Sequence, residues 1–502
     1  MDLYLYNSLT RKKEKFVPID SHGQARGTHP LRQAELDENI KDSTTSKAVV
    51  FSNLGINPPN VGLYTCGPTV YGPSHIGHAR SYVAFDILKR VLAFNGYKVN
   101  HVMNITDVHD SIIKEASRLN VSVEELSNKY IHLLHMDIGD MNCLPANYYP
   151  KVTENIEGII EMIKILIDKG YAYVEGDGSV YYRVSQFGEY GKLSGILVEQ
   201  EKAGTRVSTD KYEREEAVDF ALWKGAKEGE QSWDSPWGRG RPGWHIECSA
   251  MSKKFLGSTF DIHAGGVDIK FPHHENEIAQ SEAANGKPFV KYWVHPGLLD
   301  VDNVKMSRSL GNVYSLRDIE EKGFSALDFR YLTFLTHYRS KMSFSWEALS
   351  AAQTAYRRLL SFTQNGILPN RDTPDSGVSR IEEYNAAFPN IINNDFDMPG
   401  VLALVWKLIK DEKVSREERV GLLMKWDEVL GLKLKSQKSK VKSEGQKLKV
   451  QIPKEIREMM EEREDLRRQK KFDEADKLRV EIEKRGFKVE DTEKGSKLSS
   501  LT

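Results

Sequence analysis

Cysteine is scarce in this sequence: its 502 residues include three, Cys66, Cys143 and Cys248. So few thiols exclude the disulfide framework of a small secreted domain and suit a reducing compartment. Long apolar runs are missing too, since no segment approaches the roughly 18 residues of a membrane span. The amino terminus, MDLYLYNSLTRKKEKF, has neither a signal-peptide core nor the acid-poor composition of a transit peptide. We therefore expect a cytoplasmic protein without a membrane partner, with an organellar copy as the alternative.

A large net charge of either sign is also absent. The chain has 71 basic and 72 acidic residues, which excludes a global polycation that would bind nucleic acid through overall charge. Any basic surface must therefore be local. At 502 residues the chain is longer than a single hydrophobic core usually supports, so we expect about two to four domains.

Strand-like and helical segments alternate in the first part of the chain. VGLYTCGPTVY is typical of a strand with turn residues, and KVNHVMNIT is typical of another. Between them, SHIGHARSYVAFDILKRVLAFNGY places apolar residues on one helical face and offers Gly96 as its end. STFDIHAGG and KYWVHPGLL look like further strands of the parallel type. This order predicts an α/β fold with a Rossmann-type nucleotide-binding domain built on a parallel sheet.

The composition changes along the chain, and we expect six regions. From about residue 320 onward the pattern becomes helical and amphipathic, and KSQKSKVKSEGQKLK is typical of a flexible basic linker. The expected regions are the first half of the catalytic domain at 1–150, with a polar surface insertion at about 20–58; a connective domain at 151–238; the second half of the catalytic domain at 239–320; a helical bundle at 321–434; the linker at 435–449; and a charged helical module at 450–502.

The tetrapeptide HIGH, His75 to His78, follows an expected strand at the start of an expected helix. Helix N-termini expose unpaired amides and a positive dipole end, which suits a phosphate. The two histidines could donate to phosphate oxygens, and Gly77 would let a nucleotide approach the backbone. The alternative is a glycine turn with two incidental surface histidines.

A second basic motif, KMSRS, begins at Lys305 in a loop that we expect after the last strand. The charges of Lys305 and Arg308 and the hydroxyl of Ser307 could follow a triphosphate as charge develops on departing pyrophosphate. The alternative is an ordinary solvated basic loop.

A metal site is the third candidate. In FPHHENEIAQ, His273 and Glu277 are four residues apart and would share one helical face, as half of a zinc site could. Acidic residues at a solvated helix start are the alternative, because the helix dipole favours them. Cys66 in TCGPTVY and Cys248 in GRPGWHIECSAM are either metal ligands or buried apolar thiols.

Taken together, these motifs resemble cysteinyl-tRNA synthetases, a family of class I aminoacyl-tRNA synthetases. YTCGPTVY, HIGHAR, NITD, GRPGWHIECSAM, FPHHENEIAQ, KMSRSLGN and EDTEKGS stand in the family's order and cover nearly the whole chain apart from the 20–58 insertion and the lysine linker. The segments WDSPWG and IEMIKILIDKGYAYV resemble those of eukaryotic, plant-like members.

The resemblance implies a fold, an activity and a set of site residues. It implies a Rossmann-type catalytic domain split by the connective domain, a bundle that contacts tRNA, an anticodon-binding module at 450–502, and a monomer. The implied reaction joins L-cysteine to tRNA(Cys) with ATP and Mg²⁺, and one Zn²⁺ per chain binds the substrate thiol. The implied site residues are Cys66, Cys248, His273 and Glu277 for zinc; His75, His78, Lys305 and Arg308 for catalysis; Gly77, Gly265, Gly266, Asp268, Lys305 and Ser307 for ATP; and Thr106 and Trp244 for cysteine.

Zinc would serve selectivity. Cysteine and serine differ by one atom, and an apolar pocket separates such near-isosteres by only about two orders of magnitude. A zinc ion prefers thiolate to hydroxyl, so direct binding of the substrate sulfur makes the choice one of coordination chemistry.

Five positions depart from the family pattern: Gly72 and His109 stand where aspartate is usual, Ser111 and Arg308 where lysine is usual, and Leu498 where an aromatic is frequent. They keep open a zinc-stabilised, catalytically weakened paralogue with a tRNA-binding or regulatory role. A ligase that gives cysteine to a small amine, as in mycothiol synthesis, is a further alternative, but residues 450–502 argue against it. We expect the cysteine–tRNA ligase.

Overall fold

The fold is given by a computed structural model. It describes residues 2–19, 58–195, 206–207, 219–227, 230–307, 310–364, 377–435, 454–469, 471–484, 487–492 and 495–500. Almost all of the expected insertion and linker, and Arg308, lie outside these ranges. The chain divides into two compact units, residues 1–435 and residues 436–502. The finer domain boundaries within the first unit stay predictions.

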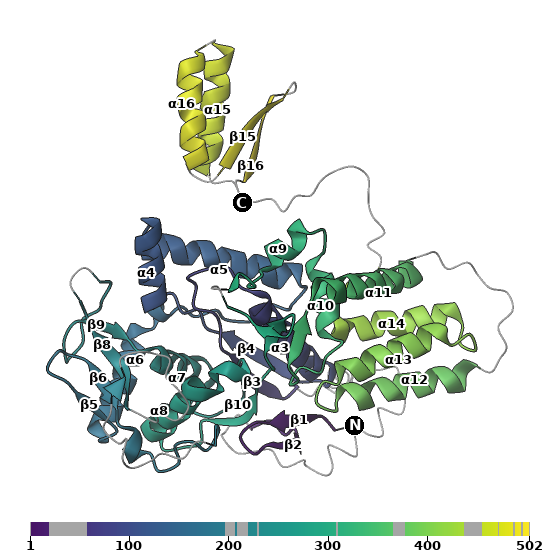
Figure 1. The fold of residues 1–502 in the computed structure, drawn as a ribbon, viewed down its shortest axis with the longest axis horizontal. Coiled ribbons are helices and arrows are strands. Elements are labelled where there is room, and N and C mark those ends of the chain that lie inside the picture. Colours follow the sequence, from purple (N-terminus) through teal and green to yellow (C-terminus); the bar gives the residue numbers. More distant parts are fainter. Residues whose placement is uncertain are drawn as a thin grey trace. The chain divides into compact units, whose positions relative to one another are not determined.

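A parallel sheet forms the centre of the first unit (Figure 1). Its order is β11-β10-β3-β4, and every neighbouring pair is parallel. The strands are β3 (Asn60–Thr65), β4 (Lys98–Met103), β10 (Phe260–Ala264) and β11 (Val290–Val294). All five residues of β10 are buried, as expected for a strand covered on both faces. The sheet confirms the predicted parallel α/β fold.

Helices cover this sheet and supply its crossovers. The helix α3 begins at Ile76, with His75 of SHIGHAR as its N-cap residue, and ends before Gly96, which has φ +84°, as the sequence predicts. The helices of this part are α3 (Ile76–Phe94), α4 (Asp110–Leu119), α5 (Val123–Asp140), α6 (Ile156–Asp168), α7 (Trp244–Leu256) and α8 (Glu275–Asn285).

A hairpin at the amino terminus lies against the β11 edge of the sheet. It consists of β1 (Tyr4–Asn7) and β2 (Lys12–Lys15). The Asn7 side chain fixes it, because Nδ2 donates to the Lys291 carbonyl at 3.0 Å and Oδ1 accepts from the Trp293 N–H at 3.1 Å. The Ser8 N–H donates to the Trp293 carbonyl at 2.9 Å, so the chain after β1 continues along β11.

The connective region contains a second sheet of short strands, in the order β5-β6-β8-β7, with β9 on β8. Its strands are β5 (Ala172–Val174), β6 (Val180–Tyr182), β7 (Arg206–Val207), β8 (Asp219–Gly225) and β9 (Gly240–Pro242). Because β9 runs into α7 through Gly243, the connective sheet holds one end of the helix that carries Cys248.

A third sheet, in the order β13-β12-β14, follows the catalytic half. Its strands are β12 (Leu299–Val301), β13 (Val304–Lys305) and β14 (Met342–Phe344). The prediction that KMSRS follows the last strand was therefore wrong, because Lys305 ends β13 and β14 comes later. β14 has only three residues, too few to show a period in the sequence.

Helices dominate the rest of the first unit, as predicted, and α11 to α14 lie side by side (Figure 1). They are α9 (Leu316–Glu321), α10 (Ala326–Thr333), α11 (Trp346–Gln364), α12 (Gly377–Ile392), α13 (Met398–Lys410) and α14 (Arg416–Leu430). In the described residues no helix has both the length and the apolar character needed to cross a membrane.

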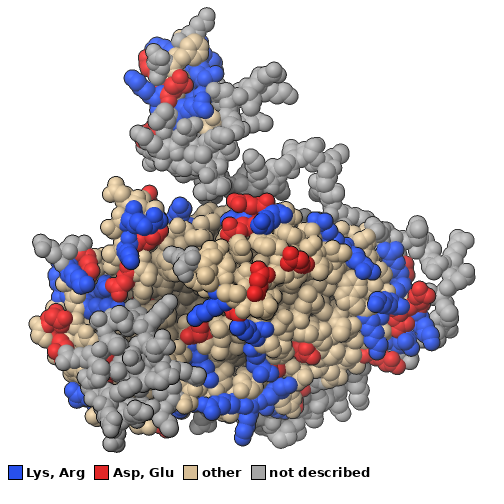
Figure 2. Space-filling model, viewed as in Figure 1, with Lys and Arg blue, Asp and Glu red and all other residues tan. Residues whose placement is uncertain are grey.

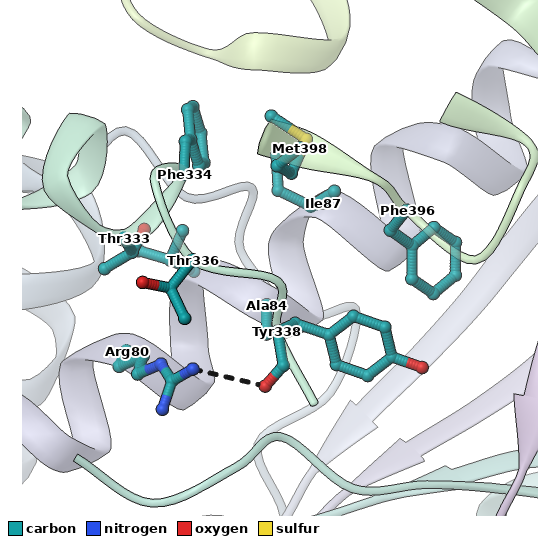
Figure 3. Close-up of a pocket in the computed structure, with 10 residues that line it drawn as sticks. Arg80, Ala84, Ile87, Thr333, Phe334, Thr336, Tyr338, Phe396 and Met398 are labelled. Carbon is teal, nitrogen blue, oxygen red and sulfur yellow. Dashed lines mark hydrogen bonds between the residues drawn. The ribbon is translucent and has the colours of Figure 1, made fainter. Parts of the chain in front are cut away.

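Arg80 ties α3 to the neighbouring loops. Its buried guanidinium donates to the carbonyls of Leu298 at 2.6 Å and Ser340 at 2.5 Å. Figure 3 shows a third bond, to the Tyr338 carbonyl, beside a small cavity. That cavity has a volume of about 20 Å³, enough for roughly one water molecule. It is thus a packing gap in the support of α3 and has no room for a substrate.

The second unit combines two helices with a β-hairpin. The elements are α15 (Lys454–Arg468), α16 (Phe472–Lys484), β15 (Phe487–Thr492) and β16 (Gly495–Ser500). The expectation of a purely helical module was incomplete, because FKVEDT and GSKLSS pair as antiparallel strands. Figure 2 shows Lys and Arg mixed with acidic residues on the visible face of the first unit, in keeping with the balanced charge of the chain.

Candidate metal centre and adenylate site

The candidate site lies at the carboxyl ends of the central parallel strands. Cys66 directly follows β3, His263 lies near the end of β10, and His295 directly follows β11. Because β3, β10 and β11 are neighbours in the sheet, their carboxyl ends bring these side chains together. In open parallel sheets, ligands bind at this edge.

The four residues expected to bind zinc form one cluster. Ligand atoms of Cys66, Cys248, His273 and Glu277 all lie within 4.8 Å of one another. Cys248 lies on α7, and the four-residue spacing at the start of α8 places His273 Nε2 3.0 Å from Glu277 Oε1. Cys66 is half-buried and the other three are buried. Two sulfurs, an imidazole and a carboxylate are a donor set that zinc accepts, so the residues fit this ion.

A second group of potential ligands shares two members with the first. His263 and His274 complete it with Cys66 and Glu277, again within 4.8 Å. His263 Nε2 lies 2.8 Å from Glu277 Oε2, and His274 Nε2 lies 3.3 Å from Cys66 Sγ. Both histidines therefore hold ligands of the first group, as the outer partners of a metal site do.

The protonation of the cluster favours a bound cation. Burial opposes ionisation of Cys248, but hydrogen bonds with Cys66 and His273 outweigh burial and lower the pKa of this thiol. Burial also opposes the Glu277 carboxylate, yet His263 and His273 lower its pKa to about 2. Burial disfavours the His273 imidazolium, but the charge of Glu277 and the hydrogen bond that His273 donates to the Cys248 sulfur raise its pKa nonetheless. The anionic donors thus stabilise a proton on His273, and a divalent metal would take the place of that proton.

The histidines of the HIGH motif stack at the start of α3. His75 is the N-cap residue, and its ring accepts from the His78 backbone N–H. The two ring centroids lie 3.7 Å apart. Both rings are half-buried, which leaves them partly accessible at the positive end of the helix. This arrangement can bind a phosphate group.

The KMSRS segment meets the HIGH segment. A side-chain carbon at Gly77 would lie 2.8 Å from Met306 Cε, so glycine lets the two segments approach this closely without a shift of Met306. The Ile76 N–H donates to the Tyr314 carbonyl at 2.8 Å, which fixes the far end of the loop on α3. Two motifs that are far apart in the sequence are therefore in contact.

The other two described KMSRS residues take different positions. Lys305 ends β13 and is exposed. The Ser307 N–H donates to Asn312 Oδ1 at 2.8 Å, which shapes the loop. Arg308 lies outside the described residues.

The two residues expected to contact cysteine lie beside the metal-ligand cluster. Trp244, the first residue of α7, stacks on His273 with 4.1 Å between ring centroids. Thr106 follows β4, and its hydroxyl donates to Glu247 Oε2 at 2.9 Å. Glu247 is buried and directly precedes Cys248. Trp244 therefore touches the cluster, whereas Thr106 reaches it through Glu247.

The glycines expected near ATP follow β10. A side-chain carbon at Gly265 would lie 2.6 Å from His274 Cε1, so this position needs glycine to let the histidine pack. Gly266 caps the short turn Val267–Ile269, and Asp268 in that turn is exposed. Gly265 thus borders the cluster, and Asp268 is accessible to a ligand.

The departures from the family pattern have structural explanations in part. His109 caps α4, because its Nδ1 accepts from the Ser111 N–H at 3.1 Å, as an aspartate oxygen also could. The His109 ring meets Trp244 edge-on at 6.4 Å. Gly72 lies half-buried in the turn before α3, and Leu498 lies opposite Val489 in the second-unit hairpin.

Sequence reasoning missed several residues of this cluster: His245, Glu247, His263, His274 and His295. Burial lowers the pKa of His274 and of His295 well below 6.5, so both are neutral at neutral pH. A signal was available, because a histidine or cysteine stands at the carboxyl end of three apolar strands in the sequence.

Solved structures share the fold. A methionyl-tRNA synthetase from Mycobacterium tuberculosis in complex with methionyl-adenylate aligns with a TM-score of 0.53 at 15% identity, over 75% of this chain and 88% of that one. A LeuRS–tRNA–LeuAMS ternary complex from Agrobacterium radiobacter K84 aligns with a TM-score of 0.55 at 11% identity, over 81% and 87%. At these identities the likeness concerns the fold.

Sequence comparisons are more specific. The family described as tRNA synthetases class I (C) catalytic domain matches residues 53–354, and the cysteinyl-tRNA ligase anticodon binding domain matches residues 450–497. The cysteine–tRNA ligase of Geobacillus sp. (strain WCH70) is 40% identical over 98% of both chains, and that of Chlamydia muridarum is 40% identical over 100% of both. These relatives are bacterial, so the plant-like character stays a prediction. By its catalytic domain, its anticodon-binding domain and its full-length relatives, the chain belongs to the cysteinyl-tRNA synthetase family of class I.

Proposed function

We propose that this chain is a cysteine–tRNA ligase. It activates L-cysteine with ATP to cysteinyl adenylate and pyrophosphate, and then transfers cysteine to the 3′ end of tRNA(Cys). The observation that carries this proposal is the cluster of Cys66, Cys248, His273 and Glu277 on the same sheet edge as the stacked histidines of HIGH. A thiol-binding group beside a phosphate-binding helix start is what the activation of cysteine requires.

The metal-ligand cluster holds one zinc ion per chain in this proposal. When bound, zinc would act as a Lewis acid that prefers the substrate thiolate to a hydroxyl. The residues of the first group are favoured over the second because they include both thiols and contact Trp244 through His273. His263 and His274 then orient Glu277 and Cys66 by hydrogen bonds.

The other site residues act on ATP and cysteine. The substrate carboxylate attacks the α-phosphorus, the bond to the β-phosphate oxygen breaks, and pyrophosphate leaves with its Mg²⁺. His75, His78, Lys305 and Arg308 stabilise the charge that develops on the phosphates, and no covalent nucleophile of the enzyme is needed. The ATP contacts proposed besides these are Gly77, Gly265, Gly266, Asp268 and Ser307, and the proposed cysteine contacts are Thr106 and Trp244.

Binding of tRNA involves the helical bundle and the second unit. The bundle at 321–434 contacts the tRNA body, and the helices and hairpin of 450–502 read the anticodon, in line with the family match at 450–497. Cytoplasmic location, the monomeric state and eukaryotic, plant-like ancestry stay predictions from the sequence, the last on the strength of WDSPWG and IEMIKILIDKGYAYV.

The alternative is a catalytically weakened paralogue that retains zinc and tRNA binding. His109 and Ser111 favour it, because they stand where aspartate and lysine are usual and the His109 ring lies beside Trp244. The His109 ring keeps the cap of α4, which argues that the local structure tolerates this change.

One experiment separates the two. Purified full-length chain is given L-cysteine, ATP, Mg²⁺ and total tRNA, and charged tRNA and bound zinc are both measured. We expect charging by the wild type and its loss, with loss of zinc, in Cys248→Ala. Cys143→Ala, the same change at a buried thiol outside the cluster, should charge normally. A folded wild type that binds zinc and tRNA without charging would establish the paralogue.

A further inference from the structure

A serine of the amino-terminal hairpin reaches toward the metal-ligand cluster. Ser8 follows β1 and is 7% exposed, because the hairpin lies along β11. Its Oγ lies 2.8 Å from Nδ1 of His295, a residue 287 positions later in the chain. His295 directly follows β11 and is buried, so this hydroxyl enters the interior of the catalytic unit.

The contact continues to a metal ligand. His295 Nε2 lies 2.8 Å from His274 Nδ1, and His274 Nε2 lies 3.3 Å from Cys66 Sγ. Ser8, His295, His274 and Cys66 therefore form an unbroken row of hydrogen bonds, which we call the Ser8 relay. His274 is fully buried, and His295 and Ser8 are 5% and 7% exposed, so the two bonds that join these three residues are largely shielded from water.

The Ser8 relay has a defined direction when Cys66 is a thiolate. A neutral imidazole carries one N–H donor and one acceptor nitrogen. If His274 donates from Nε2 to the Cys66 sulfur, its Nδ1 must accept from His295 Nε2–H. His295 Nδ1 is then an acceptor too, and the Ser8 hydroxyl must donate to it. Every proton in the row thus points toward the sulfur.

We propose that Ser8 is a positioning residue of the metal centre, which fixes the tautomers of His295 and His274 so that an N–H faces Cys66. This inference rests on the zinc site proposed above. Without the hydroxyl, the acceptor nitrogen of His295 is buried without this donor. The opposite tautomers then become available to both rings, and in that state His274 presents a lone pair to the sulfur instead of an N–H.

Loss of the N–H donor should loosen the metal. An N–H donated to a ligand sulfur stabilises the thiolate form and fixes its orientation. Changes in the outer partners of metal ligands typically cost about 10- to 100-fold in metal affinity. Because Ser8 acts through two rings, we expect an effect near the lower end, about 10-fold.

The test compares three hairpin variants of the full-length chain. Ser8→Ala removes the hydroxyl, Ser8→Thr keeps it, and Thr10→Ala removes an exposed hydroxyl of the same hairpin outside the relay. The first readout is the rate at which zinc-loaded protein loses zinc to a chromophoric chelator. The second is the thiolate-to-metal charge-transfer band of the Co²⁺-substituted protein, which reports on sulfur bonding and is independent of activity.

We expect Ser8→Ala to release zinc about 10-fold faster and to shift the Co²⁺ band, while Ser8→Thr and Thr10→Ala match the wild type. Equal release and an unchanged band in Ser8→Ala would overturn the relay and leave the proposed ligase intact. Faster release in Thr10→Ala as well would also overturn it, because the effect would then come from the hairpin's stability. A wild type that holds no zinc would instead overturn the proposed metal centre itself.

Discussion

The guanidinium of Arg330 lies 2.5 Å from the carboxylate of Asp86, and both side chains are buried. Arg330 belongs to α10 and Asp86 to α3, the helix that begins at HIGH. Arg330 also donates to the carbonyls of Leu430 at 2.8 Å and Met141 at 3.1 Å, and Arg90 shares Asp86 at 2.8 Å. One charged group thus connects the helix of the phosphate site to the end of the helical bundle.

Replacing Arg330 should destabilise the first unit strongly. In Arg330→Leu, Asp86 keeps only Arg90 as a charged partner, and the Leu430 and Met141 carbonyls lose their donor. Removal of one partner from a buried ion pair typically costs about 3–5 kcal/mol. Urea unfolding followed by circular dichroism measures the change. The exposed Arg118→Leu should unfold like the wild type, and similar curves for both variants would contradict the prediction.

His273 and His263 allow a matched test of which ligand group holds zinc. His273 belongs only to the first group and His263 only to the second. We expect His273→Asn to weaken zinc binding by more than about 100-fold, and His263→Asn to weaken it by about 10- to 100-fold as an outer partner of Glu277. Competition with a chelator of known affinity gives both constants. The reverse order would place the metal in the second group.

Gly77→Ala should disturb the contact between the two phosphate motifs. The added methyl group would lie 2.8 Å from Met306 Cε and 2.9 Å from the His75 ring, so the loop or the ring must move. Displacements of this size cost on the order of 10- to 100-fold in rate, which we expect in cysteine-dependent ATP–pyrophosphate exchange. Gly77→Ala with Met306→Ala should recover part of the loss. Gly139→Ala, on an open face of α5, should exchange normally, and an equally active Gly77→Ala would argue against the contact.

The stability of the catalytic unit should fall on mild acidification because of His101. Its ring is buried 2.9 Å from Thr65 Oγ1, and burial lowers its pKa to about 3, whereas an unfolded histidine has a pKa of about 6.5. Between these two pKa values the His101 ring binds a proton in the unfolded state but stays neutral in the folded state. The contribution is full above about pH 6.5 and is lost as pH falls toward 3, by up to about 1.4 kcal/mol per pH unit. His101→Gln should show a flatter dependence of the urea midpoint on pH between 6.5 and 5; an unchanged slope would contradict this.

The parallel sheet could be predicted because its strands are short apolar segments that alternate with a long amphipathic helix. The helix end at Gly96 could be predicted for a local reason as well, since this glycine adopts the positive φ that ends a helix. The metal ligands could be identified through the family resemblance, because each of them stands in a recognisable short motif. They are Cys66, Cys248, His273 and Glu277.

Other features depend on contacts that no local pattern carries. His274 follows His273 directly, yet its role depends on His295 and Ser8, which arrive from distant segments. The second-unit hairpin was missed because its segment alternates weakly, and Val489 is its one residue described as buried. Met306 and Gly77 lie on segments far apart in the sequence, and their close approach is a product of the tertiary fold.

The docking of the amino-terminal hairpin on β11 sets an order of events during synthesis. The bond from Asn7 to the Lys291 carbonyl can form only after Lys291, which is 284 positions later, has been synthesised. At about 5–20 residues per second, a ribosome needs roughly 15 to 60 s to make that partner. Through this interval the first-made hairpin has no strand to lie on, and Ser8 has no His295 to contact. The proposed zinc site, with Ser8 in place beside His295, is therefore completed only after the second half of the catalytic domain has emerged, although Asn7 and Ser8 are made long before it.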